Sequence, residues 1–207
     1  RLFLDALLYG QNGNVNINNI KIKQFPLKKD FSGLTDNIDD VNEFVKNCNL
    51  AQTKINLDNE IKFFKTHHAF WRNGNYAFTD LENTLGVIHI IRDPRNVITS
   101  VFNHFNIDSY AHALEFMNDP LQCIGVKGGE SGHDLMTIIS SWGNHYSSWK
   151  KFKKNNLLIK YENLINNPEK EFVKLCNFIE SISGLKFEKK LILKVIENCE
   201  FYNLKKQ

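Results

Sequence analysis

The sequence predicts an α/β fold with three layers, in which helices cover both faces of a central parallel sheet. Short apolar runs alternate along the chain with longer segments whose apolar residues recur at helical spacing. The run at 86–91 is apolar on both faces apart from His89, which is typical of a strand buried between two layers of helices. Strands that alternate with helices favour parallel pairing, so the two observations agree.

Each element follows from a local signal. Short runs rich in apolar residues predict strands at 61–65, 86–91 and 157–161. Helical spacing predicts helices at 1–9, about 37–47, 94–105, about 134–152, from 168 onward and about 188–198. Asp93 and Asn167 each precede a proline, the pattern of an N-cap residue followed by Pro at the first helical position. The segment 10–19 is rich in Asn and Gly and is expected to be a loop.

Composition narrows the class of protein. A length of 207 residues with 42% hydrophobic residues fits one domain, 1–207, with a substantial core. The net charge of +3 is too small to indicate a nucleic-acid partner. No apolar stretch is long enough to span a bilayer, and no signal peptide is visible. The four cysteines match no C-x-x-C pattern, which favours buried free thiols in a reducing compartment and hence a cytoplasmic location.

The turn after the central strand carries the most chemistry. Arg92 stands at the carboxyl end of that strand, where open α/β sheets bind their ligands. Asp93 and Pro94 then begin a helix, whose free amide groups and dipole favour an anion. Ser100 follows two helical turns later and adds a hydroxyl, so the combination suits a phosphate group. An Arg–Asp pair that only fastens the turn is the structural alternative.

Two stretches resemble motifs of the sulfotransferase family. The pattern R-D-P-R-N-V-x-x-S at 92–100 resembles the family's 3′-phosphate-binding motif, which implies that Arg92 and Ser100 hold the donor, 3′-phosphoadenosine 5′-phosphosulfate. The stretch K-T-H at 65–67 resembles a strand end whose histidine is the general base. The resemblance implies His67 in that role and Lys65 beside the transferring sulfonate. A neutral imidazole accepts a hydroxyl proton near pH 7, which agrees with this role, although a lone surface histidine is the alternative. The neighbouring His68 is expected on the opposite side of the strand.

Two further stretches resemble family segments that contact the adenine. Residues 161–168 resemble Y-E-D-L-x-x-x-P and imply Tyr161 at the nucleotide, with Asn163 in place of the usual Asp; a core tyrosine is the alternative. Residues 198–204 resemble T-S-F-x-x-M/L and imply only Phe201, because the two residues before it differ from the family's. Four collinear matches imply a P-loop-NTPase-like fold. They also imply an enzyme that moves a sulfuryl group in line to a hydroxyl or amine, without a metal ion.

Two family segments are absent from the sequence: the N-terminal phosphosulfate loop, P-K-S-G-T/N-T-W, and the C-terminal basic-glycine segment. The chain is therefore expected to be truncated at both ends and to carry about half of a donor site, which leaves open whether the fragment is active in isolation.

Alternatives to a sulfotransferase remain open at this point. A nucleotide-binding remnant would keep the fold without turnover. A P-loop-type phosphotransferase is favoured only by H-x-x-R-D-x-x-N at 89–96, which loosely resembles a kinase catalytic loop. The other kinase motifs are absent from the sequence. A metal hydrolase is disfavoured, because the seven histidines do not cluster at ligand spacing.

The acceptor is expected to be a small molecule or a carbohydrate. Phe70, Trp71, Tyr76 and Phe78 are either its apolar wall or plain core, and the loop at 125–133 is a candidate cover.

Overall fold

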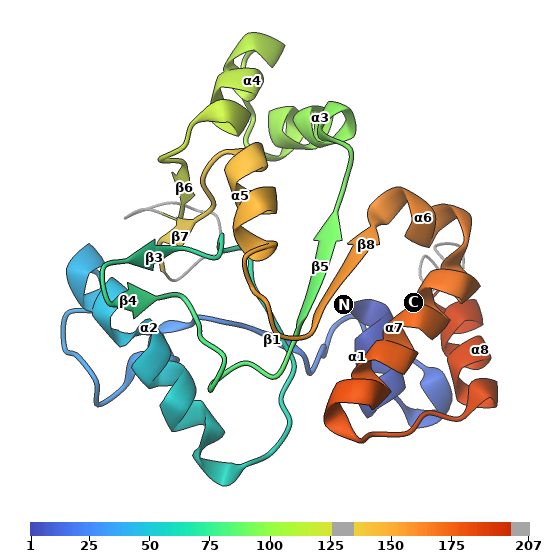
Figure 1. Cartoon of the computed structure of the whole chain (residues 1–207). Coiled ribbons are helices and arrows are strands. Elements are labelled where there is room, and N and C mark those ends of the chain that lie inside the picture. Colours follow the sequence, from blue (N-terminus) through green and yellow to red (C-terminus); the bar gives the residue numbers. More distant parts are fainter. Residues whose placement is uncertain (126–134, 200–207) are drawn as a thin grey trace.

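The computed structural model describes residues 1–125 and 135–199 as an α/β structure with parallel strands at its centre (Figure 1). β5 (Val87–Ile91) and β8 (Asn156–Lys160) pair in parallel, with His89 opposite Leu158. β1 (Lys23–Gln24) and β2 (Phe64–Lys65) form a second parallel pair. Two short antiparallel pairs lie outside these: β3 (Arg72–Asn73) with β4 (Tyr76–Ala77), and β6 (Cys123–Ile124) with β7 (Thr137–Ile138).

The helices surround these strands. They are α1 (Leu2–Tyr9), α2 (Val41–Ile55), α3 (Pro94–His104), α4 (Tyr110–Asn118), α5 (Trp142–Trp149), α6 (Tyr161–Asn166), α7 (Pro168–Ser183) and α8 (Lys189–Asn198). Single turns of 3₁₀-helix lie at Gln11–Gly13, Lys28–Phe31 and Asn56–Asp58. In Figure 1, α1, α7 and α8 gather on one side of β5 and β8, and α2 and α5 lie on the other.

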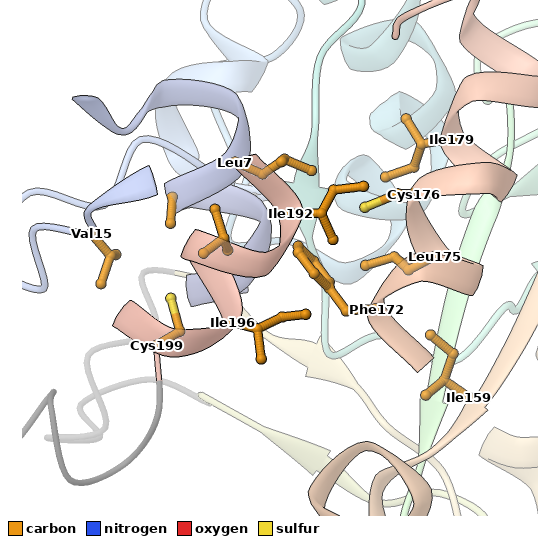
Figure 2. Packing of buried hydrophobic residues seen from close by; sticks show 12 residues of the cluster. Leu7, Val15, Ile159, Phe172, Leu175, Cys176, Ile179, Ile192, Ile196 and Cys199 are labelled. Carbon is orange, nitrogen blue, oxygen red and sulfur yellow. The ribbon is translucent and has the colours of Figure 1, made fainter. Parts of the chain in front are cut away.

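Two apolar clusters pack against opposite faces of the β5–β8 pair. The first joins α1, α7 and α8 to Ile88 and Ile159, and Figure 2 shows Phe172, Leu175, Cys176 and Ile179 of α7 directed toward the other two helices. The second joins α2 and α5 to Val87. Because Val87 and Ile88 are consecutive residues of one strand, their side chains point to opposite faces, so the strand lies between two helical layers. The predicted three-layer α/β fold is confirmed.

Local signals predicted some element boundaries well and others poorly. The strands at 86–91 and 157–161 correspond to β5 and β8, whereas only Phe64–Lys65 of the run 61–65 pairs. The helix expected at 37–47 begins at Val41, because the side chain of Asp40 accepts hydrogen bonds from the N–H groups of Asn42 and Glu43, and it continues to Ile55.

The helix expected at about 134–152 is wrong. Thr137 and Ile138 pair with β6 instead, Ser140 adopts a left-handed conformation with φ of 59°, and Ser141 caps the shorter helix α5 by accepting from the N–H of Asn144. The β-branched residues before the serines favour a strand, and the serine N-cap starts a new helix there. The first residue of the expected helix lies outside the described residues.

Candidate functional site

The turn from β5 to α3 is fastened by an acidic cap. The carboxylate of Asp93 accepts from the backbone N–H of Arg95 at 2.9 Å and forms an ion pair with the Arg95 guanidinium. These hydrogen bonds, that of the Arg95 side chain first, lower the pKa of Asp93 to about 2. The backbone N–H of Asp93 in turn donates to Glu162 at 2.8 Å, which ties the carboxyl end of β5 to the first turn of α6. The arginine that pairs with Asp93 at this turn is therefore Arg95, and the Arg92 side chain contacts other residues.

Three of the residues singled out in the sequence come together at this edge of the sheet. Arg92 donates from Nη1 to the hydroxyl of Ser100 at 3.0 Å. The same guanidinium lies over the ring of Tyr161, with its carbon 5.0 Å from the ring centroid. Arg92 follows β5, Ser100 lies in α3, and Tyr161 begins α6, so three separate elements supply the cluster. Phe201, the fourth nucleotide candidate, lies outside the described residues.

Lys65 lies at the end of β2 and lines a cavity of about 810 Å³ that is also bordered by residues of β5. Arg1 and Thr66 line the same cavity. Burial, followed by the positive charge of Arg1, lowers the pKa of the Lys65 ammonium. The wall of this cavity carries four basic side chains, those of Arg1, Lys62, Lys65 and Lys154, and two acidic ones, those of Glu60 and Glu82. The excess of positive charge suits an anionic group of a ligand.

The two neighbouring histidines occupy different surroundings. His67 is half-buried, and its backbone carbonyl lies 3.3 Å from Nε2 of His145 in α5. His68 is 1% exposed and lies between two parallel rings, 5.5 Å from Phe44 and 4.8 Å from Phe78. Its Nδ1 accepts from the backbone N–H of Ile138 at 3.2 Å. His68 is therefore part of the core, whereas His67 is only half-buried but is not among the residues that line the cavity beside Lys65.

The aromatic residues after the K-T-H stretch also prove to be mostly core. Phe78 is 3% exposed, and Phe70 and Trp71 pack against the same second cluster, whereas Tyr76 is exposed. Of the four, only Phe78 lines the large cavity beside Lys65. Most of the loop at 125–133, the candidate cover, lies outside the described residues.

Two histidines at the site were not identified from the sequence. His89 of β5 and His145 of α5 line both the large cavity and a smaller one beside Arg92, and their ring centroids are 6.3 Å apart. Burial lowers the pKa of both, that of His89 to about 4 with His145 as a second cause. The one signal available was a histidine inside an otherwise apolar strand.

Three further features of the described residues concern metal binding, membrane crossing and the cysteines. No group of three or more His, Cys, Asp and Glu side chains there is arranged to hold a metal ion. No helix within 1–125 and 135–199 is long and apolar enough to cross a membrane. The four cysteines are free thiols, and Cys48, Cys176 and Cys199 are buried.

Comparison with known proteins identifies the family. The family described as "Sulfotransferase domain" matches residues 12–207. Among solved structures, a mouse sulfotransferase, SULT7A1 complexed with PAP, is similar with a TM-score of 0.54 and 19% sequence identity. The match covers 81% of this chain and 53% of the mouse chain, so this chain spans about half the length of that protein. The mouse structure supports the fold, and the family match over nearly the whole sequence shows that the chain belongs to the sulfotransferase family.

Proposed function

We propose that this chain transfers a sulfuryl group from 3′-phosphoadenosine 5′-phosphosulfate to a hydroxyl acceptor. The observation that carries the proposal is the convergence of Arg92, Ser100 and Tyr161, because three elements place a cation, a hydroxyl and an aromatic ring at one point. The match to a sulfotransferase domain supports the same donor. The mouse relative is described as complexed with PAP, the nucleotide that remains once the donor has lost its sulfuryl group.

In this proposal the cluster binds the adenosine end of the donor. The guanidinium of Arg92 carries five N–H groups, of which one donates to Ser100, so others are available for the 3′-phosphate. The Ser100 hydroxyl accepts from Arg92 and can donate its own proton to the same phosphate. The Tyr161 ring fixes the guanidinium from one side and presents an aromatic surface near the adenine.

The transfer itself is assigned to the end of β2. His67 removes the proton of the acceptor hydroxyl while that oxygen forms a bond to sulfur. The bond between sulfur and the bridging oxygen of the 5′-phosphate breaks, and the electron pair leaves with the nucleotide. Lys65 offers positive charge where the bridging oxygen becomes negative. Burial lowers the pKa of this ammonium and also reduces the screening of its charge by water, which strengthens its attraction to an anion. No covalent intermediate with the protein is needed.

The phosphotransferase alternative loses its main support. In a kinase-like catalytic loop, Asp93 would receive the acceptor proton. Here its carboxylate caps α3 and pairs with Arg95, and its pKa of about 2 makes it a poor base at neutral pH. The free thiols agree with a reducing compartment, and we therefore propose a cytoplasmic location.

The test uses the full-length protein and donor labelled in its sulfuryl group. Transfer of label to an alcohol, with release of adenosine 3′,5′-bisphosphate, is expected from the wild-type protein. Nucleotide binding without any transfer across a broad acceptor panel would instead indicate a remnant that keeps the fold and the donor site but has lost turnover.

A further inference from the structure

One face of α5 holds the backbone that follows β2. Nε1 of Trp149 donates to the carbonyl oxygen of His68 at 2.9 Å, and the hydroxyl of Ser148 accepts from the N–H of Phe70 at 3.0 Å. Trp149 is 6% exposed and packs in the second apolar cluster, so its contact with His68 belongs to the core. Residue 145 precedes these two helix residues by three and four positions, so it lies on the same face of α5.

The contact made by His145 falls on the backbone of His67. Nε2 of His145 lies 3.3 Å from the carbonyl oxygen of His67. A carbonyl oxygen only accepts, so the imidazole must donate, which places its proton on Nε2. Burial lowers the pKa of His145, against the opposing effect of its hydrogen bonding to this backbone, so the ring is neutral at pH 7 and has a single N–H to donate. That N–H is directed at the residue to which we assign the role of base.

The reach of a general base depends on how its backbone is held. Cβ and the carbonyl carbon of His67 are both bonded to its Cα, so a fixed carbonyl direction restricts where the imidazole can point. A base must come within about 2.6–3.2 Å of the oxygen whose proton it takes, and a misplacement of about 1 Å costs about 100-fold in rate. Lys65 and Thr66 line the large cavity, so His67 directly follows the wall of that cavity in the chain.

We propose that His145 is a positioning residue for the transfer: its hydrogen bond to the His67 carbonyl aims the imidazole of His67 at the acceptor hydroxyl. The inference rests on the proposed function and adds no step to it. His145 takes no proton, which still goes to His67, and the sulfuryl group still comes from the donor. Because His145 also lines both cavities, direct contact with a ligand is the competing explanation that the experiment must exclude.

Turnover is measured on the full-length protein with labelled donor and an acceptor panel that includes 2-naphthol, cyclohexanol and methyl glucoside. The alcohol that takes most label from the wild type serves for every variant. His145→Phe keeps a ring but removes the donor. It should lower kcat about 10- to 100-fold while the KM of the acceptor and the affinity for adenosine 3′,5′-bisphosphate stay within about twofold.

Two further variants show whether the hydrogen bond is responsible. His145→Gln keeps an amide N–H near the position of Nε2 and should recover most of the lost turnover. Asn144→Ala changes an exposed neighbour on α5 and should have no effect. Turnover is expressed per molecule that binds adenosine 3′,5′-bisphosphate, so unfolded protein does not count as lost catalysis.

A double mutant separates positioning from contact with the acceptor. Because His145 acts through the base, His145→Phe should lower kcat by less than about twofold once His67 is already replaced by Ala. A full effect that persists beside His67→Ala, or a raised acceptor KM in both His145 variants, would indicate contact with the ligand and overturn the inference.

The remaining outcomes distinguish the inference from the function on which it rests. Unchanged kcat in His145→Phe, beside a large loss in His67→Ala, would overturn the positioning role and leave the proposed function standing. Near-normal turnover in His67→Ala, or no transfer by the wild type across the whole acceptor panel, would overturn the proposed function and this inference with it.

Discussion

Substituting the two adjacent histidines that follow β2 tests two assignments separately: the catalytic role of His67 and the packing role of His68. His67→Ala removes a half-buried ring that we assign to the chemistry, whereas His68→Ala removes a ring that is 1% exposed and stacked between Phe44 and Phe78. The first change should lower turnover by roughly two to four orders of magnitude, the usual contribution of a general base. It should leave adenosine 3′,5′-bisphosphate binding and stability nearly intact.

The second change acts on the free energy of unfolding. Replacing a buried aromatic residue with Ala costs about 3–5 kcal/mol. It also leaves two donors without the acceptor Nδ1: the N–H of Ile138 at 3.2 Å and Nε1 of Trp71 at 3.4 Å. Each donor left unpaired adds about 1–3 kcal/mol. A loss of that size is a large share of the about 5–15 kcal/mol that stabilises a typical domain.

The assays are sulfuryl transfer and urea unfolding of both variants. His68→Phe provides a graded control, because it keeps a ring in the stack while removing the acceptor, so its loss of stability should be smaller than that of His68→Ala. Turnover measured on the folded fraction should be much less affected in the His68 variants than in His67→Ala. Near-normal turnover in His67→Ala would refute its assignment as the base, and an unchanged unfolding midpoint in His68→Ala would refute the packing argument.

Three other predictions follow from the same contacts. Arg92→Ala should weaken adenosine 3′,5′-bisphosphate binding by an amount near the lower end of about 2–5 kcal/mol, because the Arg92 side chain is only half-buried. Calorimetry should show little change for the control Arg95→Ala, because the Arg95 side chain is 87% exposed and pairs with Asp93. Turnover of the full-length protein should persist in a chelator, because cationic side chains supply the charge; activity lost there and restored by magnesium would contradict this. Burial lowers the pKa of His89 to about 4 in the folded protein, so as pH falls the unfolded chain takes up this proton before the folded chain does. The stability that the neutral ring contributes is therefore lost as pH falls from about 6.5 toward 4. Arg92, His145 and Tyr146 face the same cavity, and the urea midpoints at pH 7 and 4.5 should differ less in His89→Phe than in the wild type.

The sequence was most informative where a local pattern and its structural consequence coincide. Asp93 before Pro94 specified the start of α3, and the apolar run before it specified β5, so the positions of Arg92 and Ser100 relative to each other followed. The contact with Tyr161 depends on β8 pairing in parallel beside β5, which brings the carboxyl ends of both strands to one edge. The family resemblance supplied that third residue, because no local signal links positions so far apart in the chain.

Long-range packing explains most of what could not be foreseen. The helical spacing from Leu135 to Phe152 is real, yet Thr137 and Ile138 pair with β6, a contact that no local pattern announces. The position of His145 beside His89 depends in the same way on α5 crossing the face of β5. Phe78 could be read as core or as acceptor wall from the sequence, and only its packing beside His68 shows that it is core.

The central claim is that the turn after β5 recognises a 3′-phosphate. Its most direct test compares adenosine 3′,5′-bisphosphate with adenosine 5′-monophosphate, which lacks only that phosphate, by calorimetry on the wild-type protein and on Arg92→Ala. We predict that the wild type binds the bisphosphate at least about 30-fold more tightly, equivalent to about 2 kcal/mol, and that Arg92→Ala loses most of this preference. Equal affinities in the wild type, or a full preference that persists in Arg92→Ala, would contradict the claim.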